Sequence, residues 1–497
     1  MKAKKILSAI CALALGICLL MACNAAPNGG MYDIPNSAVG DMIPQIGELE
    51  NYQTEDIIER DFMSPAITPD SYFSLDRNTA SYSYMRRIIN EGRKVASGSV
   101  RLEEYINYFS YDYVRPEEGD ALAISSKLFD CPWNDAHKLL SIGVAAEEVA
   151  FSEKPNNIVF LIDTSGSMYG DDRLGLIQQS FSMLTESLSA DDTVSIVTYA
   201  GDSRVALSGE IGSNKIQICN VLQDLVANGS TNGQGGIQKA YELAERYYSE
   251  EANNRVILAT DGDFNVGASS KRELESLISQ KRDSGIYLSV LGVGMYNTND
   301  TTMKTLAENG NGNYAYLDSV AEARKVLVEE LGGTFNVVAK DAKMGVTFNA
   351  DTVEKYRLLG YESKMMSQEE FDDEQNDAGE IGSGHTVTAL YEVELKENAS
   401  GSVAICEVRF KSPQTNENIA ILDMAMTDDY NETPDEDSVF IACVAEYGLV
   451  LRQSQYKGSA NIENVITRLS ALDCTKPDGN QFRAEFLEIV KKAKRIY

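Results

Sequence analysis

The spacing of hydrophobic positions changes along this chain, and each spacing predicts a different kind of structure. Between residues 155 and 333, short unbroken apolar runs alternate with stretches whose apolar residues recur at helical intervals. Unbroken runs are typical of strands buried on both faces of a sheet. The expected strands are Ile158–Ile162, Val194–Tyr199, Arg204–Leu207, Val256–Thr260, Tyr287–Val293 and Tyr314–Leu317, and the expected helices are Leu174–Leu188, Lys215–Val226, Gly236–Tyr248, Ser270–Asp283, Thr301–Glu308 and Val320–Leu331.

This alternation predicts an α/β domain with a doubly wound, mostly parallel sheet over residues 155–333. Strands Val194–Tyr199 and Arg204–Leu207 are separated only by a short hairpin-like turn, so Arg204–Leu207 is expected to be an antiparallel edge strand. In sheets of this kind ligands bind beyond the carboxyl ends of the strands. Functional side chains are therefore expected in the loops that follow the strands.

The regions on either side of this domain have other patterns. Residues 71–154 predict an N-terminal α+β module, residues 334–437 a β-rich module with period-two alternation, and residues 438–497 a helical region that packs as a cap. The elements expected are strands Tyr72–Asp76, Leu122–Phe129, Leu139–Val144, Val337–Val338, Met344–Phe348, Tyr356–Leu359, Thr386–Leu395 and Ser402–Phe410, and helices Ala80–Asn90, Leu102–Phe109, Val439–Gln453, Ile462–Ser470 and Gln481–Ala493. We hypothesise that strands from 120–150 and 335–430 join into one antiparallel β-sandwich, from which the α/β domain is inserted.

The N-terminus has the pattern of an export signal. Three lysines precede an apolar run, Ile6–Ala22, which is typical of a signal peptide over residues 1–22. The run ends in Leu-Met-Ala followed by Cys23, which resembles a bacterial lipobox with Cys23 as the lipidated residue. An uncleaved membrane anchor, or an ordinary signal peptide with an incidental cysteine, are the alternatives. Residues 23–70 are rich in proline and predict a flexible tether, so we expect a lipid-anchored, extracytoplasmic protein of a bacterial cell envelope.

The net charge of the chain narrows the classes of partner. With 75 acidic and 44 basic residues, the chain has a formal net charge of −31. This excess argues against nucleic acid or an anionic membrane surface as a partner, since both require basic patches.

Beyond the signal and Cys23, the cysteines are Cys131, Cys219, Cys406, Cys443 and Cys474, an odd number at wide spacings that is typical of neither a disulfide framework nor a zinc site. We expect buried thiols, with Cys406–Cys443 as a pair that could be oxidised.

Oxygen-bearing side chains follow the predicted strands at separate points. Asp163, Ser165 and Ser167 come directly after the first strand in the spacing D-x-S-x-S, Thr231 lies in a glycine-flanked turn, and Asp261 ends the strand Val256–Thr260. Because the carboxyl ends of parallel strands meet at one edge, these side chains are expected to converge. Carboxylates and hydroxyls are ligands that Mg²⁺ accepts. Two carboxylates and three hydroxyls underfill such an ion, which leaves an open position for water or a partner's carboxylate.

These residues resemble the metal-ion-dependent adhesion site of the von Willebrand factor type A domain: D-x-S-x-S, then a threonine, then T-D-G. The resemblance implies Mg²⁺, or Mn²⁺ or Ca²⁺, bound by Asp163, Ser165, Ser167, Thr231 and Asp261 and capped by an acidic side chain of a protein ligand. The stretches 73–87, 103–113, 131–143, 356–363 and 377–393 resemble bacterial lipoproteins that contain this domain, with a family-specific N-terminal module and an uncharacterised C-terminal region.

Enzymatic activity has little support in the sequence. His137 and His385 are the only histidines, and no G-x-S-x-G, Walker or H-E-x-x-H motif is present. We expect His385 to satisfy a hydrogen bond in a turn and Trp133 to fill a core. The favoured function is metal-dependent binding of a protein partner, for adhesion or complex assembly. The alternatives are a structural scaffold whose metal only stabilises the fold, and a metal-dependent hydrolase.

Overall fold

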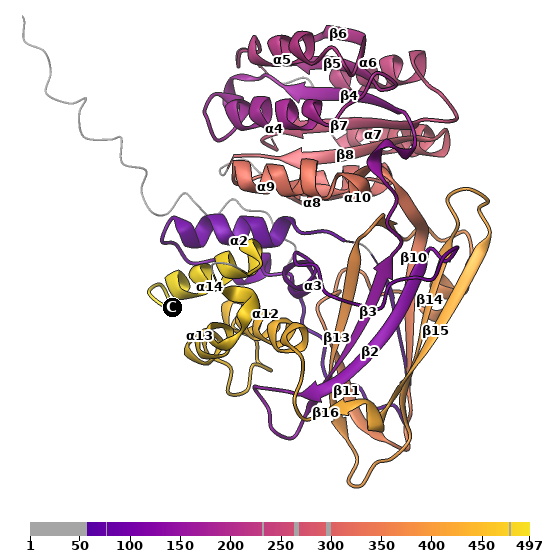
Figure 1. The fold of residues 1–497 in the computed structure, drawn as a ribbon, viewed down its shortest axis with the longest axis vertical. Helices are drawn as coiled ribbons and strands as arrows, with labels where there is room; N and C mark the ends of the chain where they lie inside the picture. Colours follow the sequence, from indigo (N-terminus) through magenta and orange to yellow (C-terminus); the bar gives the residue numbers. More distant parts are fainter. Residues whose placement is uncertain (1–56, 76, 231–232, 263–267, 295–299, 477–478) are drawn as a thin grey trace, which may run out of the picture. The chain divides into compact units, whose positions relative to one another are not determined.

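The structure is a computed structural model that describes residues 57–497, apart from 76, 231–232, 263–267, 295–299 and 477–478 (Figure 1). The predicted signal peptide, Cys23, most of the tether and Thr231 lie outside the described residues. Among the described helices, none is long and apolar enough to cross a bilayer.

A central sheet of the α/β domain has the strand order β6-β5-β4-β7-β8-β9. Its strands are β4 (Asn156–Asp163), β5 (Thr193–Tyr199), β6 (Ser203–Ile211), β7 (Asn253–Thr260), β8 (Ile286–Gly292) and β9 (Tyr314–Tyr316). All neighbours are parallel except β5 and β6, which form the antiparallel edge that the sequence predicts. Every residue of β4 is buried, because the strand lies inside the sheet with helices on both faces.

The helices of this domain cover the two faces of the sheet. They are α4 (Leu174–Glu186), α5 (Lys215–Gln223), α6 (Gly233–Arg246), α7 (Ala268–Asp283), α8 (Asp300–Asn309), α9 (Val320–Arg324) and α10 (Leu331–Phe335). Alternate side chains of β4 enter different cores: Phe160 stacks on Phe181 of α4 with ring centroids 4.2 Å apart, whereas Leu161 belongs to the core that contains Ile237 of α6. The predicted helix Val320–Leu331 is interrupted, since a π-helical segment, η4 (Lys325–Glu329), separates α9 from α10.

Two antiparallel sheets form a β-sandwich beside this domain (Figure 1). One sheet has the order β11-β13-β3-β2-β16, with β2 (Leu122–Asp130), β3 (Lys138–Ala146), β11 (Val353–Leu359), β13 (Thr386–Leu395) and the short parallel β16 (Tyr430–Asn431). The other has the order β1-β10-β14-β15, with β12 also paired to β10: β1 (Asp70–Ser74), β10 (Val337–Phe348), β12 (Gly379–Gly382), β14 (Ser402–Lys411) and β15 (Asn418–Met426). Because β3 pairs with β13 in the register Ile142↔Ala389, and because the inner faces share one core, the hypothesis of a joint sandwich is confirmed.

The sandwich departs from the expected elements in several places. Val337–Val338 and Met344–Phe348 belong to the single strand β10, which continues through an irregular pairing where Asp341 has a φ of 49°. Strand β15 was not expected, and neither were β12 and the short helix α11 (Gln368–Asp372).

Helices from both ends of the chain form one layer against the sandwich. The N-terminal helices are α2 (Ala80–Asn90) and α3 (Leu102–Ile106), and the C-terminal ones are α12 (Glu436–Arg452), α13 (Ile462–Ala471) and α14 (Gln481–Ala493). Tyr82, Phe109, Phe440 and Phe486 pack their rings together in this layer. The C-terminal helices therefore complete the N-terminal module.

The tryptophan and the described cysteines can now be compared with the expectations for them. Trp133 is 1% exposed, as expected of a core residue. The five described cysteines are free thiols; Cys406 lies in β14 and Cys443 in α12, so the pair proposed for oxidation is not formed.

Candidate metal centre

The first part of the site follows from strand order. Because β4 and β7 are parallel neighbours with Ile162 opposite Ala259, they end together at one edge of the sheet. Asp163 is the last residue of β4, and Asp261 directly follows β7. The sheet thereby brings the two predicted carboxylates to the same edge. Asp163 is 0% exposed and Asp261 is 2% exposed, so both are withdrawn from solvent.

Hydrogen bonds fix the Asp163 carboxylate in place. Its Oδ1 accepts the backbone N–H of Ser165 at 2.8 Å, and its Oδ2 accepts the hydroxyl of Thr260 at 3.0 Å. Asp163 thus ties the loop after β4 to the end of β7. The D-x-S spacing is what allows the first of these bonds, since an aspartate side chain readily caps the amide two residues on.

The predicted hydroxyls gather beside this carboxylate. Ser165 Oγ and Ser167 Oγ are 3.0 Å apart, and Ser165 is buried while Ser167 is partly exposed. The loop that precedes Thr231 lies alongside, because Gly166 N–H donates to Gly229 O at 3.0 Å and Asn228 N–H donates to Thr164 O at 2.7 Å. Four of the five predicted ligands are described, and their loops meet at this edge.

Electrostatics at this edge favour a cation. Burial, and then the neighbouring Asp261 carboxylate, raise the pKa of Asp163 above its ordinary value of 3.8, against the opposing effect of the Ser165 hydrogen bonds. A bound divalent ion would offset this repulsion. The set of carboxylate and hydroxyl oxygens fits a hard cation such as Mg²⁺. No cluster of three or more His, Cys, Asp or Glu side chains suited to a metal occurs in the described part of the chain.

Two residues outside the predicted ligand set complete the surroundings of the site. Thr260 binds Asp163, and Arg173 donates from Nη1 to the carbonyl oxygen of Ser167 at 2.5 Å. Thr260 is part of the T-D-G triplet, so its position was visible in the sequence although its role was not. Arg173 carried no signal, since its contact depends on how the loop before α4 folds back.

His385 lies in a turn of the described chain with its ring enclosed. The His385 backbone N–H closes a turn with Gly382 O at 3.2 Å, but its imidazole Nε2 has no hydrogen-bond partner among the described residues. The expected turn hydrogen bond of His385 is therefore made by its backbone N–H, whereas its ring is packed against Gly333. Burial lowers the pKa of His385 to about 3, so the ring is neutral. Ser383 Oγ donates to Val149 O, away from that ring.

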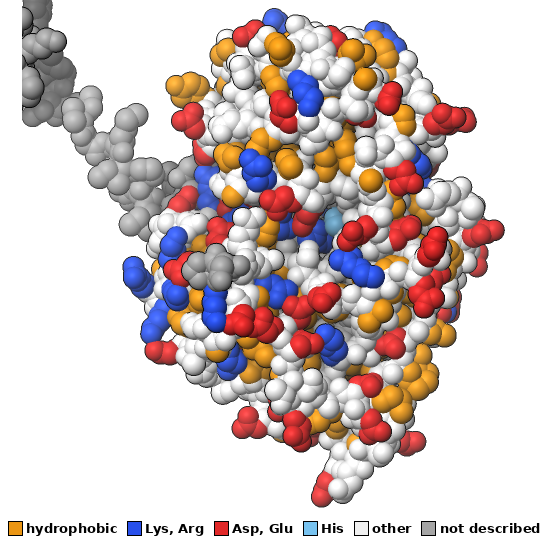
Figure 2. Space-filling model, in the orientation of Figure 1, with side chains coloured by type: hydrophobic (Ala, Val, Ile, Leu, Met, Phe, Trp, Pro, Cys, Tyr) orange, Lys and Arg blue, Asp and Glu red, His pale blue; other side chains and the backbone are white. Residues whose placement is uncertain are grey.

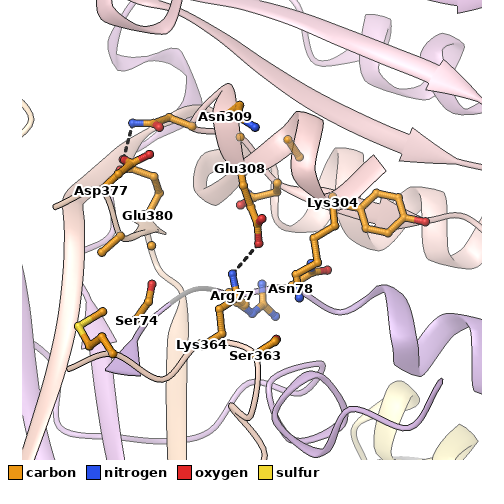
Figure 3. Close-up of a pocket in the computed structure, with 18 of the residues that line it drawn as sticks. Ser74, Arg77, Asn78, Lys304, Glu308, Asn309, Ser363, Lys364, Asp377 and Glu380 are labelled. Atoms are coloured by element: carbon orange, nitrogen blue, oxygen red, sulfur yellow. Dashed lines mark hydrogen bonds and ion pairs between the residues drawn. The ribbon is translucent and has the colours of Figure 1, made fainter. Parts of the chain in front are cut away.

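A polar cavity of about 400 Å³ lies where α8 and β9 meet β1 and β12 (Figure 3). Its charged groups are bound to protein groups: Lys364 Nζ donates to Glu308 at 2.6 Å, Lys304 Nζ to Glu104 at 3.3 Å, and Asn311 Nδ2 to Glu380 at 2.6 Å. Ligand pockets are mostly apolar with a few polar groups directed at the ligand. We therefore assign no ligand to this cavity.

Comparison with known proteins agrees with this architecture. Residues 157–331 match the von Willebrand factor type A domain, residues 48–141 match a family described as von Willebrand factor, and residues 333–403 and 394–496 match the C-terminal region of the uncharacterized protein YfbK. YfbK of Escherichia coli (strain K12) is 37% identical over 455 residues, which cover 86% of this chain and 78% of that protein.

The chain belongs to the YfbK family of von Willebrand factor type A domain proteins. The predicted type A domain family, with one module before the domain and another after it, is thus confirmed, whereas the lipid anchor stays a prediction. More distant similarity is limited to part of the chain: the inter-alpha-trypsin inhibitor heavy chain H4 of Sus scrofa is 28% identical over 169 residues, 32% of this chain and 18% of that protein. The solved structure of von Willebrand factor type A from Catenulispora acidiphila is 15% identical, with a TM-score of 0.39, and covers 66% of this chain and 79% of that one.

Proposed function

We propose that this YfbK-family protein binds a divalent cation at the edge of its type A domain and uses the ion to hold an acidic side chain of a protein partner. Proteins with this domain mediate protein interactions. The observation that carries the proposal is the convergence of the buried Asp163 carboxylate with the Ser165 and Ser167 hydroxyls beside Asp261. The ligands would be Asp163, Ser165, Ser167, Thr231 and Asp261. Mg²⁺ is the expected ion, with Mn²⁺ or Ca²⁺ as alternatives.

The ion would supply positive charge at an otherwise acidic edge. The hydroxyls are expected to bind it directly, and Asp163 and Asp261 to hold its waters, an arrangement in which carboxylates tune a metal from outside. Neutral hydroxyls leave most of the ion's charge uncompensated, which favours a carboxylate in the open position.

The proposal assigns no catalytic role to the buried thiols or to His385, whose ring is neutral and enclosed. Burial raises the pKa of Cys406 to about 12 and of Cys443 to about 11, so neither is a thiolate at neutral pH.

Nucleic acid is not the proposed partner. The face of the molecule drawn in Figure 2 carries acidic side chains with basic ones interspersed, and the net charge of the chain is −31.

Location in the cell envelope is the second part of the proposal. It is supported by the lysines and apolar run before Cys23, which would receive the lipid that anchors the chain to a bacterial membrane. Cys23→Ser is expected to move the full chain from the membrane fraction to the soluble fraction. Retention of the variant in the membrane fraction would contradict the lipid anchor but leave the metal site unaffected.

The binding function is tested by capture of envelope proteins on the immobilised chain in Mg²⁺, followed by elution with EDTA. Wild type is expected to release a partner into EDTA, and Asp163→Ala to capture none. The matched control is Asp191→Ala, an exposed carboxylate of the same domain. A partner that binds wild type and Asp163→Ala alike, in Mg²⁺ and in EDTA, would favour the scaffold function over the adhesion function.

A further inference from the structure

Helix α2 of the N-terminal module contacts the loop that carries Ser165 and Ser167. Arg87, in the last turn of α2, donates from Nη2 to Asp172 Oδ2 at 2.7 Å. Asp172 lies in this same loop, between Ser167 and α4. A second donor of Arg87, Nη1, reaches the hydroxyl of Tyr316 at 3.0 Å, at the end of β9. One guanidinium therefore joins the N-terminal module to two parts of the type A domain.

Further contacts connect Tyr316 to Ser167, one of the predicted ligands. Tyr316 OH donates to Gly294 O at 2.6 Å, just beyond β8. Gly294 packs against Arg173, since a Cβ on Gly294 would lie 2.8 Å from Arg173 Nε. Arg173 in turn donates to the carbonyl oxygen of Ser167. Arg87 thus reaches the Ser167 backbone through a continuous series of hydrogen bonds and close packing.

The residue before Arg87 holds α2 in place. Arg86 donates from Nε to Asp318 Oδ2 at 2.7 Å and from Nη2 to Glu322 Oε2 at 2.7 Å, and the three side chains are at most 5% exposed. Asp318 and Glu322 lie just after β9, on the type A domain. A buried arginine paired with two carboxylates is directional and desolvated, so it fixes the orientation of the helix. Arg86 docks α2, and Arg87 then faces the metal-site loop.

We propose that Arg87 is a positioning residue through which the N-terminal module holds the loop of residues 163–173 in the shape that binds the cation. The inference rests on the proposed function of that loop as a metal site. It adds regulation: whatever displaces α2 would loosen the loop and lower the affinity for the ion and its partner. Groups beyond the direct ligands are known to control metal affinity by orienting the ligands.

The geometry requires an arginine. Its planar fork presents separate donors to Asp172 and Tyr316, whereas a lysine at this position offers a single point charge. Arg87→Lys is therefore expected to keep the ion pair and lose the simultaneous bond to Tyr316. The Asp172 side chain is 50% exposed, so the pair contributes little to global stability. Loss of loop order and loss of fold can thus be separated by experiment.

The first test measures backbone hydrogen exchange of residues 163–173 in the full chain without metal. Arg87→Gln is expected to speed exchange in this loop several-fold, and Arg87→Lys to give an intermediate effect. Arg93→Gln is the matched control, because it removes the same charge from the same module, where Arg93 pairs with Glu91 at 3.3 Å. Exchange in Arg87→Gln equal to that in Arg93→Gln would overturn the proposal.

The second test measures Mg²⁺ and Mn²⁺ affinity by calorimetry. Arg87→Gln and Tyr316→Phe are expected to weaken binding by roughly tenfold, while the unfolding temperature in EDTA stays at that of Arg93→Gln. Faster exchange with unchanged ion affinity would overturn the coupling. If the wild-type chain binds neither ion, the proposed function fails, and the exchange experiment alone decides whether Arg87 positions the loop.

Discussion

At the scale of single residues, Asp163 is expected to have opposite effects on stability with and without metal. Its pKa in the folded state is raised above 3.8 by burial and by Asp261. As the pH rises past 3.8, the unfolded chain releases the Asp163 proton before the folded chain does. The free energy of unfolding therefore decreases as the pH rises. The ionised form of this carboxylate therefore destabilises the metal-free protein.

Asp163→Asn is predicted to unfold at a higher temperature than wild type in EDTA and at a lower one in Mg²⁺. The order reverses because only wild type gains from binding, about 2.7 kcal/mol when the ion is at 100 times its dissociation constant. Thermal unfolding followed by circular dichroism measures the unfolding temperatures in EDTA and in Mg²⁺. Asp191→Asn, at an exposed carboxylate, is the control. An equal Mg²⁺ effect on wild type and Asp163→Asn would contradict the role of this carboxylate.

The lowered pKa of His385 predicts that acid decreases the stability of the folded chain. Its folded-state pKa is about 3, whereas the ordinary value is 6.5, so below pH 6.5 the unfolded chain binds a proton that the folded chain does not. Stability is then lost between pH 6.5 and 3, by up to about 1.4 kcal/mol per pH unit from this group. Urea unfolding at pH 7 and 4.5 is expected to show a smaller loss for His385→Gln than for wild type. The same pH slope in both proteins would show that His385 does not cause it.

Local motifs made part of the site predictable. Asp163, Ser165 and Ser167 follow one apolar strand at a fixed spacing, and strand order then brings Asp261 to them. The contribution of Arg173 was not predictable, because it depends on a loop that folds back on itself. The turn hydrogen bond of His385 was predicted, but the packing of its ring was not, because the distant Gly333 determines it.

At the scale of elements, the sequence predicts best where burial is regular. The bounds of α2, α14 and β13 agree with the expectation, since each has a sustained apolar face. Strand β15 was missed because it is at the edge of its sheet and exposes apolar residues on its outer face: Leu422 is 66% exposed and Met424 is 51% exposed. Without a polar outer face, period-two alternation does not show.

This difference predicts unequal costs for two apolar truncations in strands. Phe160→Ala in β4 removes a fully buried ring that stacks on Phe181, and is expected to lower the free energy of unfolding by about 3–5 kcal/mol. Leu422→Ala in β15 removes a side chain that is 66% exposed, and is expected to stay within about 0.5 kcal/mol of wild type. Urea unfolding measures both variants. Similar costs for the two would mean that β15 is covered in solution.

At the scale of the whole molecule, the type A domain is an insertion in the sandwich. The chain leaves after β3 and returns at β10, and the two crossings are adjacent, because Asn336 Nδ2 donates to Val149 O and to Ala150 O. Matching period-two patterns before and after the domain made a joint sandwich a reasonable hypothesis. The pairing of β1 with β10 was beyond prediction, since it joins segments far apart in sequence with no local signal.

The docking of α2 on the type A domain predicts a large effect from Arg86→Ala. The substitution leaves Asp318 and Glu322 buried without their cation, and is expected to cost about 3–5 kcal/mol of stability in urea unfolding. Arg204→Ala, at an ion pair with Asp202 that is mostly exposed, is the control and is expected to have little effect. Equal stability of the two variants would contradict a fixed position of α2.

The most direct test of the metal site is a calorimetric titration of the full chain with Mg²⁺ and Mn²⁺. Wild type is predicted to bind one ion, and Asp163→Ala and Ser165→Ala to bind none. Ser182→Ala, which removes a hydroxyl of α4 that donates to Gln178 O, is predicted to bind like wild type. A wild-type chain that binds neither ion, or an Asp163→Ala variant that binds as tightly as wild type, would contradict the site.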